Sequence, residues 1–471
     1  MESIVNNIED KMIDSLSFKL PSGSSYVLDR KTVNYFSTGS NTFKINGTRV
    51  LTLKLNGEDG AWLDPSSVRI MYTINNVDPT AGGDRKRLRT MTGPHCMWKR
   101  MRVSVAGQLI EDIDSYNRVH EMFESVKSDK TRDNEDIHGF GCRWDDADTM
   151  TQAYTVGGKP EIGEMYTQET MPGIKQGERR IVSFKPLAGI FNQEKYLPLK
   201  YCPIDVQLEL IDDPDEAFIK PGITVAFPAN YTAAVAGTSP EVLGTTQEFE
   251  INDCRVICDV LTLNSEVNNS YNEVLLKGTP LPIYFQTFVT SQQNVKNLED
   301  INLVVSRAVS RLKAAFITFY KGDASIIGQR SNEFSHPNAF APDGLYNWNY
   351  DLEWSINLGS NRYPIMPCRS IGETFYHLKK TLNFLNPSQD SVSFSFAQYR
   401  RDKYIIGMSF EKALNSPYSG VNTKAGQQLV FKAKPNNGTT VPGANLFDDV
   451  FVTLLHDCFV EIRETGVALF D

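Results

Sequence analysis

Apolar and polar residues alternate with a period of two along much of the chain. The alternation is clear at 50–55 (Val-Leu-Thr-Leu-Lys-Leu), at 68–74 and at 204–210 (Ile-Asp-Val-Gln-Leu-Glu-Leu). Because successive side chains of a strand point to opposite faces, these stretches predict β-strands with one buried face. Turn-forming pairs such as Asn56-Gly57 separate them. The pattern predicts a chain that consists mainly of short strands.

Two internal stretches follow the helical period instead. Between about 116 and 127, four apolar residues fall on one face of a helix. They are Val119, Met122, Phe123 and Val126. A second helix is predicted around 373–375. In both places the helix interrupts a series of strands.

Residues 1–20 form a separate predicted unit, a narrow amphipathic helix that ends before Pro21. Its apolar positions are Ile4, Ile8, Met12 and Leu16, and they are candidates for docking on a partner. Three interpretations are open: a helix packed on its own domain, an arm that docks on a neighbouring subunit or an internal partner, or a membrane-surface helix. The acidic residues of this segment disfavour the last, because anionic lipid repels them.

The same order of blocks occurs twice along the chain, although residue identities match poorly. The first series is a strand at 99–105, the helix near 121–123, and strands at 181–185, 204–210 and 253–256. The second is a strand at 311–316, the helix near 373–375, and strands at 429–432, 450–454 and 457–460. This order predicts a duplicated β-domain.

A chain of 471 residues is longer than the ~250–300 at which a single core stops growing. We therefore expect an N-terminal arm (1–20) and two domains, 21–265 and 266–471. The fold class predicted is all-β, with two tandem eight-stranded jelly rolls, short helices and long loops. Irregular segments at about 129–178, 212–245 and 321–346 are expected to decorate a surface or to contact a neighbour.

Composition narrows the possible functions. The net charge of −9 disfavours a protein that neutralises nucleic acid, so no specific nucleic-acid binding is expected. The seven cysteines are scattered, which favours reduced, buried thiols over a disulfide framework. No run of ~20 apolar residues predicts a transmembrane segment, and the N-terminus does not resemble a signal peptide.

Motifs that would indicate catalysis or metal binding are missing from the sequence. It contains no phosphate-binding loop, no Cys-x-x-Cys pair, no His-Glu-x-x-His and no Gly-x-Ser-x-Gly. The six histidines are isolated in the sequence and are interpreted as surface imidazoles. Acidic clusters at 145–148 and 212–216, and basic clusters at 85–89 and 400–403, are interpreted as loops. We expect no enzymatic activity, no metal and no cofactor.

Several blocks together resemble a known family. They are 98–111 (Trp-Lys-Arg-Met-Arg-Val-Ser-Val-Ala-Gly-Gln-Leu-Ile-Glu), 184–191 with 196–199, 354–359 with Tyr363-Pro364, and 418–423. In this order they resemble the double jelly-roll major capsid proteins of small eukaryotic DNA viruses, namely Polinton-like viruses, virophages and adintoviruses. The resemblance extends from about residue 30 to the end of the chain.

The resemblance implies a structural subunit of an icosahedral virion. Three chains would form a pseudo-hexameric capsomer, and capsomers would tile a shell around double-stranded DNA. The implied partners are further copies of the chain, a penton protein and other minor capsid proteins, and the implied location is the virion capsid after assembly inside the host cell. The resemblance supplies no catalytic residue.

Two other functions are compatible with an all-β chain of this kind. A minor capsid or spike protein would assemble only with a different protein. A carbohydrate-binding or carbohydrate-hydrolysing β-sandwich would bind sugar as a monomer through an acidic and aromatic cleft. The duplication disfavours the first, because most minor pentameric capsid proteins have one jelly roll. The lack of a carboxylate motif disfavours the second.

Overall fold

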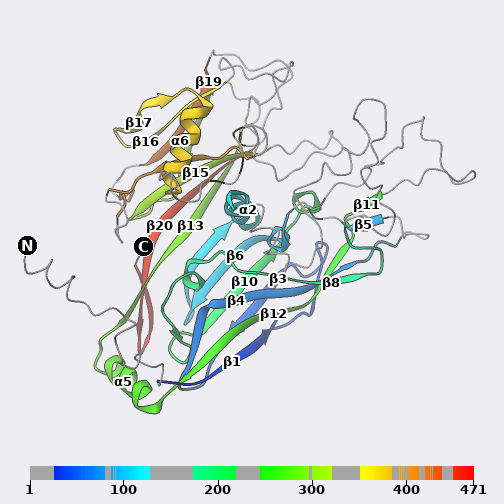
Figure 1. Cartoon of the computed structure of the whole chain (residues 1–471), viewed down its shortest axis with the longest axis vertical. Coiled ribbons are helices and arrows are strands. Elements are labelled where there is room, and N and C mark those ends of the chain that lie inside the picture. Colours follow the sequence, from blue (N-terminus) through cyan, green and yellow to red (C-terminus); the bar gives the residue numbers. More distant parts are fainter. Residues whose placement is uncertain are drawn as a thin grey trace, which may run out of the picture.

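The computed structural model contains two β-sandwiches that lie next to one another, with a helix at one end of the molecule (Figure 1). The described residues are 26–79, 86–127, 173–218, 244–295, 300–320, 351–383, 403–412, 419–436 and 449–470, except 89, 91, 425 and 427, together with 392, 394, 396 and 399. The predicted arm at 1–20 lies outside them.

The first sandwich consists of two antiparallel sheets that contribute four principal strands each. One sheet has the order β1-β12-β4-β8 and the other the order β3-β10-β6-β7. These strands are β1 (Val27–Phe36), β3 (Val50–Leu55), β4 (Ala61–Asn76), β6 (Trp98–Val105), β7 (Gln108–Asp114), β8 (Arg179–Phe184), β10 (Ile204–Leu210) and β12 (Phe249–Leu263).

The second sandwich has the same construction. Its sheets have the orders β13-β20-β15-β18 and β14-β19-β16-β17. These strands are β13 (Leu281–Asn294), β14 (Ile301–Val305), β15 (Leu312–Tyr320), β16 (Leu352–Leu358), β17 (Asn361–Cys368), β18 (Ile406–Ser409), β19 (Leu429–Pro435) and β20 (Asp449–Arg463).

The two sandwiches have one topology. Counted along each half, the first, eighth, third and sixth strands form one sheet, and the second, seventh, fourth and fifth form the other. A helix lies between the fifth and sixth strands in both halves: α2 (Tyr116–Val126) and α6 (Ile371–Thr381). This is the jelly-roll arrangement, so the prediction of two tandem eight-stranded jelly rolls is confirmed.

Short elements complete the two halves. Two-residue or edge strands β2 (Thr42–Phe43), β9 (Leu197–Pro198) and β21 (Gly466–Phe470) extend the larger sheets, and β5 (Lys86–Leu88) pairs with β11 (Gly244–Thr246). The 3₁₀ helices are η3 (Pro94–Met97), η5 (Gly189–Phe191) and η6 (Pro214–Glu216). Helix α5 (Ser265–Leu276) connects the sandwiches, and the predicted boundary between 265 and 266 falls at its first turn.

The predicted alignment of the two halves was wrong by one strand for three of its four strand pairs and right for 253–256 with 457–460, and the duplication is real. The segment 311–316 belongs to β15, which is the counterpart of β4 and not of β6. The segments 450–454 and 457–460 are parts of one strand, β20, which corresponds to β12. A period-two pattern recurs in several strands, such as β3 and β10, so the pattern alone does not say which strand of the sandwich it is.

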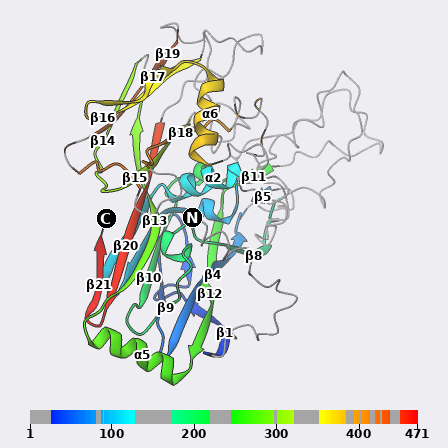
Figure 2. The ribbon, with the colours of Figure 1, turned by 60° about the vertical axis from the view of Figure 1, so that its left-hand side comes forward.

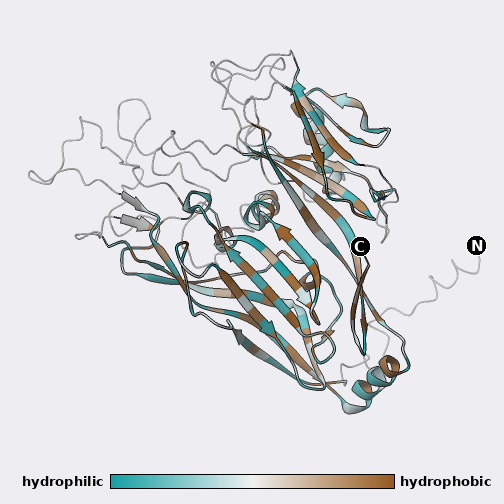
Figure 3. Cartoon of the chain, turned by 180° about the vertical axis from the view of Figure 1, so that it is seen from behind, coloured by the Kyte–Doolittle hydropathy of each residue, from teal (hydrophilic) through white to brown (hydrophobic). Residues whose placement is uncertain are grey.

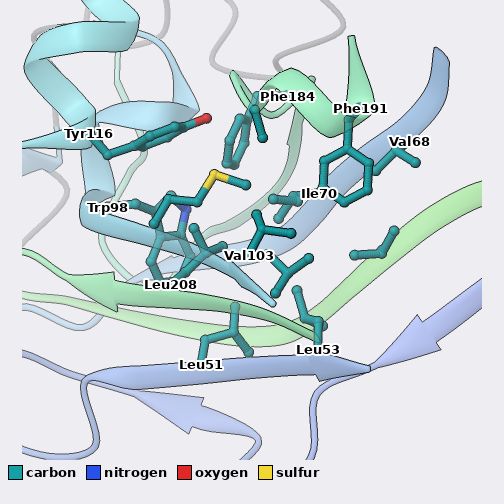
Figure 4. Packing of buried hydrophobic residues seen from close by; sticks show 14 of the residues in the cluster. Leu51, Leu53, Val68, Ile70, Trp98, Val103, Tyr116, Phe184, Phe191 and Leu208 are labelled. Carbon is teal, nitrogen blue, oxygen red and sulfur yellow. The ribbon is translucent and has the colours of Figure 1, made fainter. Parts of the chain in front are cut away.

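Alternation along the strands produces the core between the sheets, as the hydropathy colouring shows (Figure 3). On β3, Leu51 and Leu53 are buried, whereas Val50 is 53% exposed. They face Val68 and Ile70 of β4 from across the sandwich, around the central strand β6 (Figure 4). A one-residue slip would expose the whole apolar set, so burial fixes the register.

The three long irregular segments predicted from the sequence fall at three different positions in the strand order of the two halves. Residues 128–172 follow α2, 219–243 lie between β10 and β12, and 321–350 lie between β15 and β16; all three lie outside the described residues. The described part of the predicted segment 212–245 contains η6 and β11.

Candidate functional site

The junction between the two sandwiches is an apolar interface and not a flexible connection. Strands β13 and β20 are long enough to extend from the second sandwich along the side of the first (Figure 2). Ile283, Phe285, Val460 and Ile462 on these strands are buried in the core of the first sandwich. The two halves are therefore held together by hydrophobic burial in addition to α5.

Residues of helix α2 contact the second sandwich at this junction. The Phe123 ring lies 5.0 Å from that of Phe288 and 5.4 Å from that of Phe316, between ring centroids. The guanidinium carbon of Arg118 lies 3.9 Å from the centroid of the Tyr320 ring. Such ring pairs contribute ~0.5–1.5 kcal/mol each beyond their buried area. The helix predicted from the sequence therefore joins the first sandwich to the second.

Glu111 of β7 occupies a buried position at the same junction. Its carboxylate accepts hydrogen bonds from the backbone N–H groups of Gly189 (2.8 Å) and Ile190 (3.1 Å) at η5. Burial raises the pKa of Glu111, and the hydrogen bonds from the backbone of Gly189 and Ile190 oppose that rise. A Cβ at position 189 would lie 2.0 Å from the Gln286 carbonyl oxygen, so only glycine fits there.

Two histidines that are separated in the sequence pack against each other in the core of the first sandwich. The rings of His95 (η3) and His120 (α2) are stacked with centroids 4.1 Å apart. His95 Nε2 lies 3.0 Å from a Glu121 oxygen, and His120 Nδ1 lies 3.0 Å from the Tyr116 hydroxyl. Burial and the neighbouring His95 lower the pKa of His120 to about 4, so its imidazole is neutral at pH 7.

The interpretation of all six histidines as surface imidazoles was therefore wrong for this pair, and also for His456, which is 2% exposed. His95 is 2% exposed and His120 is 5% exposed, so no substrate reaches them from solvent. Within the described part of the chain, no three His, Cys, Asp or Glu side chains are placed to hold a metal ion. The arrangement is suited to orienting α2 in the core by hydrogen bonds, which buried polar groups require.

The cysteines agree with the sequence interpretation as far as they are described. All except Cys142, which lies outside the described residues, are buried and form no disulfide. Cys254 and Cys258 lie on the same strand, β12, as their spacing predicted. Burial raises the pKa of the Cys96 thiol and of the Cys258 thiol to about 12. Thiols of this kind are poor nucleophiles at neutral pH.

The acidic cluster at 212–216 forms a turn and η6, whereas residues 86–88 of the basic cluster at 85–89, interpreted as a loop, form strand β5. Asp212 forms an ion pair with Lys99, and Asp213 caps η6 by accepting a hydrogen bond from the Asp215 N–H (2.9 Å). The clusters at 145–148 and 400–402 lie outside the described residues. The described residues of the acidic and basic clusters give no indication of catalysis or ligand binding.

The four candidate docking residues also lie outside the described residues, namely Ile4, Ile8, Met12 and Leu16. The first described residue, Tyr26, accepts a hydrogen bond through its carbonyl oxygen from the Asn264 N–H (2.8 Å). The chain therefore enters the first sandwich beside the start of α5.

The most exposed large apolar side chains form a feature that the sequence interpretation missed. Ile365 is 87% exposed and Met366 is 74% exposed, both on β17 at the edge of the second sandwich. Pro364 and Pro367 flank them. Two prolines around two apolar residues were the available signal, because proline is confined to strand edges and bulges.

Comparison with known proteins gives matches at the level of structure only. No protein-family model matches the sequence, and no curated protein matches it. No helix of the described residues has the length and apolar character needed to span a membrane.

Solved viral structures are similar over almost the whole chain. A chain of the Sputnik virophage structure matches with a TM-score of 0.56 and 10% identity, over 97% of this chain and 91% of that one. The Faustovirus major capsid protein matches with a TM-score of 0.56 and 9% identity, over 98% and 94%. A chain of the PBCV-1 virus capsid matches with a TM-score of 0.54 and 11% identity, over 96% and 99%. The chain thus has the double jelly-roll fold that is found in viral major capsid proteins.

Proposed function

We propose that this chain is a major capsid protein, a structural subunit whose trimers form pseudo-hexameric capsomers of an icosahedral shell around double-stranded DNA. The observation that carries the proposal is the duplication itself: two sandwiches with the same strand order in one chain. The structural likeness to capsid proteins over 96–98% of the chain supports it. The function requires no catalytic group, no metal and no cofactor.

The duplicated fold is suited to a capsomer with a six-sided outline. Three copies related by a threefold axis present six similar lobes, so one gene product contacts six neighbours. The division into lobes at 21–265 and 266–471 belongs to this proposal. The apolar junction supports it, because a fixed angle between the lobes is needed for a regular tile. Stable obligate interfaces commonly bury more than ~2,000 Å² in total, which lobes of this size supply.

The proposed partners are further copies of this chain, a penton protein and other minor capsid proteins. The proposed location is the virion, after assembly inside the host cell. The net charge of −9 supports a shell that does not bind the genome tightly.

The test is the assembly state of the purified full-length chain, measured by mass photometry and negative-stain microscopy. We expect trimers with a pseudo-hexagonal outline that form larger arrays. A monomer with no such particles under any assembly condition would overturn the proposal. A monomer that binds polysaccharide would favour the carbohydrate-binding alternative, and assembly only with a second virion protein would favour a minor capsid or spike protein.

We also propose that residues 1–20 are an arm that docks on a neighbouring subunit. Deletion of this segment should leave a folded trimer but impair shell formation, because the arm would act between capsomers. A matched variant replaces Ile4, Ile8, Met12 and Leu16 with serine and keeps the length and charge of the segment. Shells of normal yield and size from both variants would refute the docking role.

A further inference from the structure

Strand β17 carries an apolar protrusion at the edge of the second sandwich. Trp354 of β16 pairs with Cys368, and Ile356 pairs with Tyr363. Between these two pairs, β16 contributes a single residue, whereas β17 contributes the four residues 364–367. The extra residues form a bulge at the edge of the sheet. We name residues 364–367 the β17 knob.

The composition of the knob indicates that it contacts another molecule. Its central residues, Ile365 and Met366, are more exposed than any other large apolar residue among those described. Prolines on both sides restrict the backbone, so ordering the knob in an interface costs little conformational entropy. Exposed apolar groups of this kind on an edge strand favour aggregation unless a partner covers them.

Positive charge flanks the apolar tip. Arg362 is exposed at the start of β17, and Arg369 follows its end with 62% of its side chain exposed. Arg369 Nε lies 3.2 Å from an oxygen of Glu353, which keeps the guanidinium beside the knob. A matching surface therefore requires an apolar hollow with acidic side chains around it.

The first sandwich has such a hollow, of about 540 Å³. Apolar groups from Ile45, Val77 and Phe249 line it, together with the acidic residues Asp78, Asp212 and Glu248. Asp212 is already paired with Lys99, so the exposed Glu248 supplies the negative charge that faces solvent. Lys44 also lines the hollow, but its ammonium group is paired with Glu250 at 2.7 Å. Val77 is 40% exposed, so an apolar wall is open to solvent. We name it the Val77 hollow.

The knob and the hollow lie on opposite sides of one molecule. In Figure 1, β17 lies on the left at the outer end of the second sandwich, and β11, whose Thr246 lines the hollow, lies on the right at the upper end of the first. A chain cannot fill its own hollow. A contact between two different patches is head-to-tail, and three such contacts close a ring when each copy is rotated by a third of a turn.

We propose that the β17 knob of one copy docks in the Val77 hollow of the next copy and closes the trimer. The inference rests on the proposed function, because it names the contact that makes the trimer. The second copy is the occupant that the charges favour, since the exposed Arg362 beside the knob matches the exposed Glu248 at the hollow.

Site-directed crosslinking tests the contact directly. The protein is the full chain with Cys142→Ser, to which Met366→Cys and Val77→Cys are added, and the reagent is a short bismaleimide. The other native thiols are buried and do not compete. We expect a covalent trimer on denaturing gels and no larger product, whereas either single-cysteine variant should give none.

A second measurement uses dilution of the trimer in mass photometry. Ile365→Ser with Met366→Ser should raise the dissociation constant of the trimer about tenfold or more, because two apolar side chains lose their burial. Leu276→Ser on α5, 64% exposed, is the matched control and should leave it unchanged.

The outcomes distinguish a failure of the proposed contact from a failure of the proposed function. A wild-type trimer without a covalent product, and with unchanged dissociation in the knob variant, overturns the contact but not the capsid function. Covalent products larger than a trimer place the knob between capsomers and also overturn the proposed ring. A wild-type protein that never forms trimers overturns the proposed function.

Discussion

The contact of η5 with β13 gives a sharp test of the junction between the sandwiches. In Gly189→Ala, the new Cβ would lie 2.0 Å from the Gln286 carbonyl oxygen and 2.6 Å from Phe285 Cδ2. Contacts under 3.0 Å essentially never occur, so η5 or β13 must move by about 1 Å. Such overpacking costs ~1–3 kcal/mol. Movement of η5 also weakens the hydrogen bonds that Glu111 accepts, each contributing ~1 kcal/mol.

We therefore expect Gly189→Ala to destabilise the protein by about 3 kcal/mol, which lowers the melting temperature by roughly 6–12 °C for a unit of this size. The assay is differential scanning calorimetry at a fixed scan rate and protein concentration. Gly47→Ala is the matched control, because its Cβ would meet only Lys44 atoms at 3.7 and 3.9 Å. A melting temperature of Gly189→Ala within 2 °C or so of both the wild type and this control would refute the reasoning.

Three further predictions concern the junction and the first core. Phe123→Ala removes the contacts with Phe288 and Phe316 and should cost about 3 kcal/mol in chemical denaturation; a loss below about 1 kcal/mol would contradict the role of α2. The pKa of His120 is about 4 in the folded protein and near 6.5 in the unfolded chain, so the unfolded state binds more protons between these pH values. The free energy of unfolding should therefore fall by about 3 kcal/mol as the pH drops from 6.5 to 4. Calorimetry over this range should show a flatter profile for His120→Gln, and identical slopes would exclude His120 as the cause. A Cys142→Ser variant should react with a thiol reagent only on unfolding, since the described cysteines are buried; rapid labelling of the native protein would contradict that burial.

Several elements could be predicted from the sequence because they depend on local patterns. The alternation at 204–210 corresponds to β10, and the apolar face at 116–127 corresponds to α2. The buried residues of β10 are the apolar ones of the printed alternation. The acidic cluster at 212–216, interpreted as a loop, contains the single-turn helix η6.

Other features depended on contacts between distant residues. The alignment of the two halves failed because a strand pattern does not identify the neighbour of that strand in the sheet. In β1 and β12, for example, Val33 pairs with Cys258, which lies far along the chain. The pairing of His95 with His120 likewise requires η3 to pack on α2.

The sequence by itself determined that the chain is all-β, duplicated and interrupted by helices, because the period of the side chains fixes which face of each element is apolar. Only the tertiary structure decided which strands are neighbours, that β13 and β20 enter the first core, and that Ile365 and Met366 stay outside any core. The physical reason is that burial depends on what covers a face. An apolar residue is recognised in the sequence, but its exposure is set by elements that may lie hundreds of residues away.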